Sequence, residues 1–124
     1  MLLDSNIIIY SANREHAELR HFLNENLYSV SAVSRIEVLG YHLLAGKQRE
    51  YLEKFFDAAS VLAISDSVVT QAVQLRQEKR MSLGDAIVAG TALTHQLKLV
   101  TRNVRDFSWI HGLNVINPLE REAT

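Results

Sequence analysis

Four acidic side chains lie where they could together hold a divalent cation. Asp4 follows an apolar pair at the start of the chain, and Glu37 lies among apolar neighbours at helical spacing. Asp85 and Asp106 follow in the second half of the chain. A group of carboxylates repels itself unless a hard cation such as Mg²⁺ or Mn²⁺ compensates the charge. Such an ion can activate water and hold a phosphate, which is the chemistry of metal-dependent nucleases and phosphatases.

The expected fold brings three of these acids to one edge of a sheet. Asp4 ends the first strand, Asp85 begins a helix, and Asp106 lies just past the strand that ends at Thr101. In a parallel sheet, the carboxyl ends of the strands and the amino ends of the following helices share one edge, where ligands bind. Glu37 is expected on a largely buried helix, where an unpaired carboxylate is costly and therefore needs a cation, a donor or a cleft.

Taken singly, each acid also has a structural explanation that involves no catalysis. One of Asp4, Ser5 and Asn6 is expected to cap the first helix. Asp85 follows Ser82 at the spacing of a capping box. The other two acids could pair with a base or lie in a turn. The hypothesis of a metal site therefore depends on the four acids in combination.

The elements that must position these acids alternate between short apolar strands and helices. Strands are expected at residues 1–4, 28–31, 61–65, 98–101 and 114–117. Helices are expected from residue 6 and at residues 14–25, 31–46, 47–59, 65–80 and 82–96. This alternation predicts an α/β fold, a three-layer sandwich with a mostly parallel central sheet, in a single domain over residues 1–124.

Three details of these helices are also predicted. The helix at 14–25 is expected to turn Ala17, Phe22 and Leu23 inward. The helix at 31–46 is expected to end at Gly46, because glycine is the common residue just past a helix end. The helix at 82–96 is rich in small residues and is therefore expected to pack closely against the sheet.

Composition excludes several other classes of protein. The chain has 124 residues, 48% of them hydrophobic, which suits one globular core. It has no cysteine, which excludes disulfides, thiolate metal sites and a Cys nucleophile, and its five histidines lack the spacing of a zinc site. A net charge of −1 gives no overall attraction to nucleic acid. Without a long apolar run or a signal peptide, we expect a cytoplasmic protein with no membrane partner.

Four segments, taken in order, resemble the PIN-domain nucleases. They are LLDSNIII, SRIEVLGY, LGDAIVAGTAL and LVTRNVRDF, and they span nearly the whole chain. The short length, with SRIEVLG and TRNVRDF, is most similar to the VapC-type toxins of toxin–antitoxin pairs. The resemblance implies a PIN-like fold and a Mg²⁺-dependent endoribonuclease that cleaves RNA, in which Mn²⁺ can replace Mg²⁺.

The resemblance also implies roles for individual residues. Asp4, Glu37 and Asp85 correspond to ligands of Mg²⁺, and Asp106 to a fourth catalytic acid. Many relatives carry an acid two residues after the Thr of the last motif, where this chain has Asn103; others rely on the acid just before the Phe, here Asp106. The polar residues that would support the acids are Ser5, Asn6, Thr101 and Asn103.

Partners follow from the same resemblance. VapC-type toxins look like homodimers that bind an antitoxin, so we expect both here, besides an RNA substrate. The helix surfaces at 32–44 and 48–59 carry Tyr41, Tyr51 and Phe55, which could anchor a partner's aliphatic residues or instead fill the core. A partner's Arg would meet complementary charge at the converging carboxylates and block both cation and RNA.

Two alternatives to a nuclease stay open. One is a non-catalytic PIN-like module that binds RNA or protein, because a missing fourth charge at Asn103 could impair turnover. The other is a Mg²⁺-dependent phosphatase, which would usually carry a second Asp where this chain has Asn6.

Overall fold

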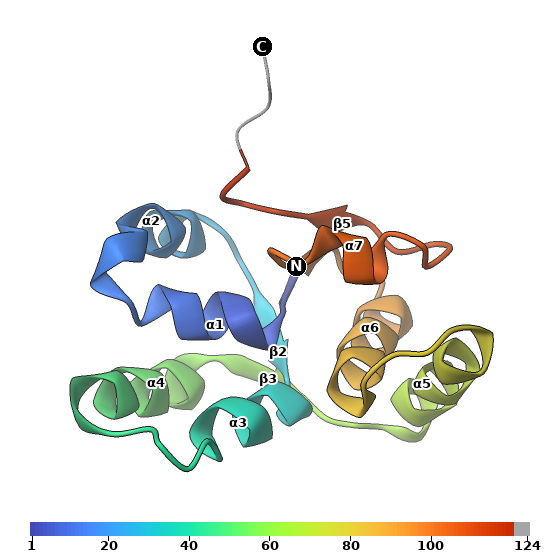
Figure 1. The fold of residues 1–124 in the computed structure, drawn as a ribbon, viewed down its shortest axis with the longest axis horizontal. Coiled ribbons are helices and arrows are strands. Elements are labelled where there is room, and N and C mark those ends of the chain that lie inside the picture. Colours follow the sequence, from blue (N-terminus) through green and yellow to red (C-terminus); the bar gives the residue numbers. More distant parts are fainter. Residues whose placement is uncertain (121–124) are drawn as a thin grey trace.

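Five short strands form one parallel sheet in the order β3-β2-β1-β4-β5 (Figure 1). They are β1 (Leu2–Leu3), β2 (Ser29–Ser31), β3 (Ser60–Leu62), β4 (Leu99–Val100) and β5 (Val115–Ile116). The protein is described by a computed structural model that covers residues 1–120. Every strand pairing in it is parallel, which confirms the α/β class and the predicted parallel sheet.

Helices connect the strands and cover both faces of the sheet. They are α1 (Ser5–Ser11), α2 (Ala17–Glu25), α3 (Ala32–Leu39), α4 (Gly46–Ala58), α5 (Asp66–Glu78), α6 (Leu83–His95) and α7 (Val104–Phe107). In Figure 1, α1, α2 and α4 lie on one side of the sheet and α5 and α6 on the other, as in the predicted three-layer sandwich. None of these helices has the length and apolar character needed to cross a bilayer.

The sheet separates two hydrophobic clusters, because successive side chains of a strand point to opposite faces. Leu3, aligned with Val30 and Val100, faces one cluster, whereas Leu2, aligned with Leu99, faces the other. The first cluster is completed by Ile7, Ile8, Leu19, Leu23, Val38, Leu52 and Phe56. The second is completed by Val33, Leu75, Val88, Ala89, Ala92, Phe107 and Ile110.

The small residues of α6 allow close packing on two sides. Ala89 and Ala92 are buried in the second cluster against the sheet, as predicted. On another side Gly90 meets the backbone of α5: a Cβ at Gly90 would lie 3.0 Å from the Val68 carbonyl oxygen and 3.2 Å from the Ala72 nitrogen. Close packing therefore involves a neighbouring helix as well as the sheet.

Helix α3 is shorter than the sequence pattern predicted. It begins after Ser31, whose hydroxyl accepts a hydrogen bond from the Val33 N–H, and it ends at Leu39 with Gly40 as its cap. Gly46 does not end this helix. It has a φ of 63° and begins α4, so its left-handed conformation serves the turn between the two helices.

The segment at 14–25 is also divided differently from the prediction. A 3-10 turn, η1 (Arg14–His16), precedes α2, which begins at Ala17. Ala17 is exposed, so its predicted inward position was wrong, and the buried residues of α2 are Leu19 and Leu23. Phe22 is half-buried against the first cluster.

Candidate active site

The carboxyl ends of β1 and β4 meet where the order of the strands reverses. The chain runs outward from β1 to β2 and β3, and then returns to the other side of β1 for β4 and β5. In open α/β sheets, a crevice forms at such a point beyond the strand ends. Asp4 follows β1 and Thr101 follows β4, and the Thr101 hydroxyl donates a 2.8 Å hydrogen bond to Asp4 Oδ2. This bond joins the two central strands at the crevice.

Asp4 is also the cap of α1. Its Oδ1 accepts a 2.8 Å hydrogen bond from the Ser5 backbone N–H, and its side chain is almost fully buried. Burial, with the negative charges of Asp85 and Glu37, raises the pKa of Asp4 from 3.8 to about 6, although the hydrogen bonds from Thr101 and Ser5 lower it. Asp4 can therefore cap α1 and at the same time belong to the cluster of acids.

Glu37 approaches the same crevice from α3, but not from a buried helix as predicted. The Glu37 side chain is exposed, and the neighbouring Ile36 is 67% exposed. Only one side of α3, which carries Val33, Ser34 and Val38, packs inward. The expectation of a largely buried surrounding was wrong, and Glu37 lies at the rim of the crevice.

Small residues around the Glu37 carboxylate determine its position. The Ser5 hydroxyl donates a 2.9 Å hydrogen bond to Glu37 Oε1, and the Ser34 hydroxyl lies 2.9 Å from that of Ser5. Gly84 at the start of α6 leaves room for the carboxylate, since a Cβ there would lie 2.6 Å from Glu37 Oε2. Sequence reasoning missed Ser34 and Gly84. Their signals were local: Ser34 precedes Glu37 by three residues on one helix face, and Gly84 adjoins Asp85.

Asp85 lies in the first turn of α6 and faces the other acids. Ser82 caps this helix, because its Oγ accepts a 3.1 Å hydrogen bond from the Asp85 N–H, as the capping spacing predicted. Burial raises the pKa of the Asp85 carboxyl, a hydrogen bond with Ser82 opposes this shift, and the negative charges of Asp106 and Glu37 add to it. The cap is thus supplied by the serine, and the Asp85 carboxylate belongs to the acidic group.

Asp106 lies in α7, a short helix that the sequence did not predict. It is exposed in the first turn of that helix, and it is near enough to Asp85 for its charge to raise the pKa of that carboxyl. The alternative that Asp106 lies in a turn is therefore wrong. Asn103 precedes α7, shares a cleft with Asp106, and donates from its backbone N–H to Thr101 Oγ1 at 3.0 Å.

Two of the four residues expected to support the acids touch a carboxylate directly. These are Ser5 and Thr101. Asn103 contacts Thr101 through its backbone. Asn6 is exposed on α1, and its side chain forms no hydrogen bond within residues 1–120.

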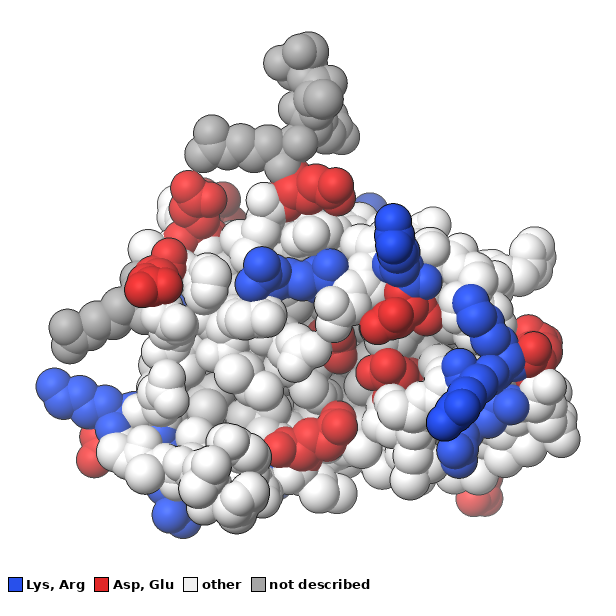
Figure 2. All heavy atoms as spheres, in the orientation of Figure 1, with Lys and Arg blue, Asp and Glu red and all other residues white. Residues whose placement is uncertain are grey.

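The four acids (Asp4, Glu37, Asp85 and Asp106) together form what we call the acidic group. Figure 2 shows acidic side chains gathered in the middle of one face, with basic side chains beside them. Within residues 1–120, no three acidic or imidazole side chains already stand close enough to share one ion. The donor set nevertheless suits a hard divalent cation, because it consists of oxygens whose mutual repulsion a cation would relieve.

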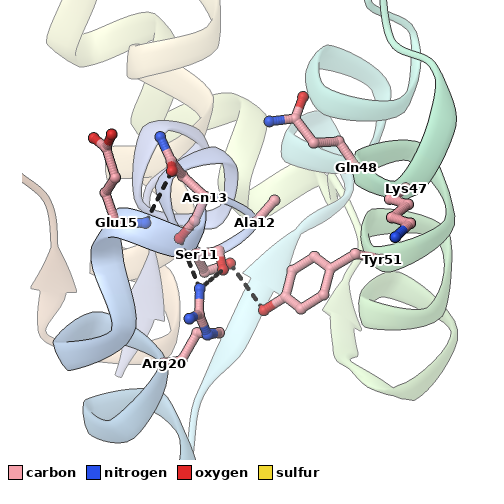
Figure 3. A pocket seen from close by; sticks show the side chains of 8 residues that line it. All are labelled: Ser11, Ala12, Asn13, Glu15, Arg20, Lys47, Gln48 and Tyr51. Atoms are coloured by element: carbon pink, nitrogen blue, oxygen red, sulfur yellow. Dashed lines mark hydrogen bonds between the residues drawn. The ribbon is translucent and has the colours of Figure 1, made fainter.

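A larger cleft of about 530 Å³ lies at the other end of α1, away from the acidic group (Figure 3). Hydrogen bonds of Arg20 and Tyr51 cross this cleft. Arg20 Nη1 donates to the carbonyl oxygens of Ser11 and Asn13, and the Tyr51 hydroxyl donates to Ser11 Oγ. These bonds attach the end of α1 to α2 and α4. We therefore assign this cleft a structural role.

Comparison with known proteins points to one family. The sequence profile of the PIN domain matches residues 1–110. The tRNA(fMet)-specific endonuclease VapC of Shigella flexneri is 28% identical, over 90% of this chain and 92% of that protein. A chain from a toxin-antitoxin complex of Klebsiella pneumoniae is 31% identical, with a TM-score of 0.75, over 97% of this chain and 98% of that one. DNA-bound VapBC from Salmonella typhimurium has the same fold, with a TM-score of 0.84 at 23% identity, over 94% and 96% of the two chains.

Proposed function

The chain belongs to the PIN-domain family and is of the VapC toxin type, and from that premise we propose that it is a metal-dependent endoribonuclease of the cytoplasm. We propose further that it is the toxin of a toxin–antitoxin pair. The observation that carries the activity is the acidic group at the ends of β1 and β4, in which burial and mutual charge raise the pKa of Asp4 and Asp85. Carboxylates whose pKa is raised in this way destabilise the folded state at neutral pH, and groups with shifted pKa values are typical of functional sites.

The four acids have two roles in this proposal. Asp4, Glu37 and Asp85 would hold Mg²⁺ or Mn²⁺, and a bound ion supplies an activated water and compensates charge on the scissile phosphate. Asp106, which is exposed, is free to orient that water through a charged hydrogen bond.

Neighbouring polar side chains keep the acids in position. Thr101 fixes the Asp4 carboxylate, and Ser5 fixes that of Glu37. Because these hydroxyls contact the acids and not the reaction directly, they are positioning residues. Their loss is expected to weaken metal binding more than it weakens the fold.

A cleavage assay with a chelator tests the activity. The purified protein should cleave RNA with Mg²⁺ or Mn²⁺, and Asp4→Asn should abolish cleavage. Undiminished cleavage in excess EDTA would rule out the metal mechanism. RNA binding without cleavage would instead favour the non-catalytic module, and hydrolysis of a phosphate monoester without RNA cleavage would favour the phosphatase.

A groove beside the acidic group suits the proposed antitoxin. It has a volume of about 240 Å³, lies between α1, α3 and α4, and contains Glu37 at its acidic end. Its apolar side chains Ile9, Tyr41 and Leu43 are 45%, 54% and 67% exposed. An aliphatic segment of a partner could occupy this groove while an Arg extends past Glu37 into the acidic group.

Only one of the three expected anchor residues is largely exposed. Tyr41 is exposed and lines the groove. Tyr51 is half-buried and hydrogen-bonded to Ser11, and Phe55 is stacked on Tyr28 with a centroid distance of 5.8 Å. Tyr51 and Phe55 therefore fit the alternative that they belong to the core, and the proposal keeps Tyr41 alone.

Two measurements test the partners. Light scattering on the purified chain should give the mass of a homodimer. Inhibition of cleavage by the co-encoded antitoxin should weaken as Mg²⁺ rises, because the partner's Arg and the cation would compete for the same carboxylates. A stable monomer whose cleavage is unaffected by that protein would contradict the toxin assignment.

A further inference from the structure

A pocket with basic walls adjoins the acidic group. Its volume is about 210 Å³, and it is lined by Lys79, Arg80, Arg105, Trp109, Asp85 and Asp106. We call it the basic pocket. Figure 2 shows basic side chains over α5 and α7 beside the acidic ones. We propose that the basic pocket binds a backbone phosphate of the RNA strand next to the one that is cleaved, an inference that rests on the proposed ribonuclease function.

The cations of this pocket come from two separate parts of the chain. Lys79 and Arg80 directly follow α5, and Arg105 lies in α7. Cations at the end of a helix complement its dipole, which by itself would explain the first two. The helix dipole does not explain why Arg105, which comes much later in the chain, lines the same pocket. The convergence of the two segments therefore indicates a shared ligand.

The three cations are not used to neutralise the neighbouring acids. Within residues 1–120, no ion pair involves Lys79, Arg80 or Arg105, and the pairs His21–Glu25 and Arg49–Glu53 lie on other helices. The basic side chains thus retain their capacity for an external anion, and a phosphodiester is the anion that an RNA-cleaving site must meet.

Trp109 gives the pocket a fixed wall. Its Nε1 donates a 2.9 Å hydrogen bond to the Asp106 carbonyl oxygen, which anchors the ring to α7. Lys79 Nζ lies 5.4 Å from the centre of that ring, at the distance of a cation–π contact. The ring therefore orients the ammonium without neutralising it. Since Trp109 is the only tryptophan of the chain, the tryptophan fluorescence reports on the surroundings of this one ring in the pocket wall.

A volume of about 210 Å³ accommodates a phosphate group and lies below the range typical of pockets for larger organic ligands. The acidic group by itself repels an RNA strand. Cations directly beside it would offset this repulsion and place one phosphate, so that the next phosphate lies over the acids. Such contacts read no base, and they act on binding more than on the chemical step.

The test uses the full chain with a short single-stranded RNA of mixed sequence. Tryptophan fluorescence and anisotropy of labelled RNA are followed in excess EDTA, which prevents cleavage, and KM and kcat are measured with Mg²⁺. The variants are Lys79→Ala, Arg105→Ala and Arg105→Lys. Lys98→Ala is the matched control, because Lys98 is exposed at the opposite edge of the sheet, just before β4.

RNA is expected to change the Trp109 fluorescence of the unmodified protein. Lys79→Ala and Arg105→Ala should each weaken RNA binding and raise KM by about tenfold, with kcat little changed, as for loss of a charged hydrogen bond. The dependence of log K on log salt should become shallower by about 0.7 for each phosphate of the single strand that the variant no longer neutralises. Arg105→Lys should recover part of the affinity, and circular dichroism should show that all variants are folded.

The outcomes separate this inference from the proposed function. Suppose the protein cleaves RNA, but Lys79→Ala and Arg105→Ala have the same KM and the same salt dependence of binding as the control Lys98→Ala. The basic pocket is then not a phosphate site, and the inference is overturned. If RNA changes the fluorescence and both alanine variants weaken binding, the inference holds even if no cleavage is seen.

Discussion

Replacement of Asp4 by Asn is expected to abolish activity and yet, at neutral pH, to stabilise the protein. Asp4 is 4% exposed, and its carboxylate feels the charges of Asp85 and Glu37. Its pKa is raised from 3.8 to about 6 in the folded protein. The folded state therefore holds this proton more tightly than the unfolded chain does. The free energy of unfolding accordingly falls as pH rises from 3.8 to about 6, and it stays lower above that window.

The size of the effect follows from the same shift. A rise of about two pKa units corresponds to about 3 kcal/mol of lost stability at neutral pH, at 1.36 kcal/mol per unit. An Asn side chain carries no charge, so it avoids this loss. The Asn oxygen can still accept from the Ser5 N–H and cap α1, but the amide nitrogen in place of Oδ2 cannot accept the hydrogen bond from Thr101, at a cost of about 1 kcal/mol. Asp4→Asn should therefore be more stable than the unmodified protein by about 2 kcal/mol at neutral pH.

Urea unfolding followed by circular dichroism, in EDTA and across the acid-to-neutral range, measures this difference. The advantage of Asp4→Asn should shrink as pH falls and reverse to a deficit of about 1 kcal/mol below the lower pKa. Asp57→Asn, which removes one charge from an exposed site on α4, is the control and should show no such trend. A variant that is less stable at neutral pH, or a difference that does not vary with pH, would refute the reasoning.

Four further results are expected. Asp85→Asn should lose cleavage but stay folded, since Ser82 supplies the cap; loss of the fold would show that the carboxylate is structural. Asp106→Asn should reduce the cleavage rate more than Asn103→Ala, and Asn103→Asp should raise Mg²⁺ affinity; equal losses from the two removals would contradict the ranking. Gly84→Ala should displace the Glu37 carboxylate and slow cleavage by up to about 100-fold with little change in unfolding midpoint. Mg²⁺ at ten times its dissociation constant should stabilise the unmodified protein by about 1.4 kcal/mol and Asp4→Asn much less, as thermal unfolding would show.

Asp4 must remain charged to bind a cation, yet it is buried, and this conflict explains why the site occupies this edge of the sheet. The Thr101 hydroxyl and the Ser5 N–H provide two donors that partly offset the burial of the carboxylate. Both donors exist only because β1 and β4 are neighbours and because α1 begins directly after β1. A buried acid is thus retained at a position where the fold already supplies hydrogen bonds.

Much of the fold could be predicted from the sequence, because its determinants are local. Short apolar runs marked the five strands, and the spacing of Ser82 to Asp85 marked the start of α6. Local sequence patterns predicted less well the features that depend on tertiary packing, such as where a helix ends and how deeply a side chain is buried. The helix predicted to reach Gly46 stops at Leu39, and the surroundings of Glu37 proved to be open.

The sequence by itself determined which residues could do chemistry and that a parallel sheet would bring some of them to one edge. Only the tertiary structure decided which groups meet there. The hydrogen bond from Thr101 to Asp4, that from Ser5 to Glu37, and the space beside Gly84 all join segments far apart in the chain. So does the basic pocket, which combines the end of α5 with α7. Strand order and helix packing create such contacts through the burial of two whole faces of the sheet, and no short stretch of residues encodes that arrangement.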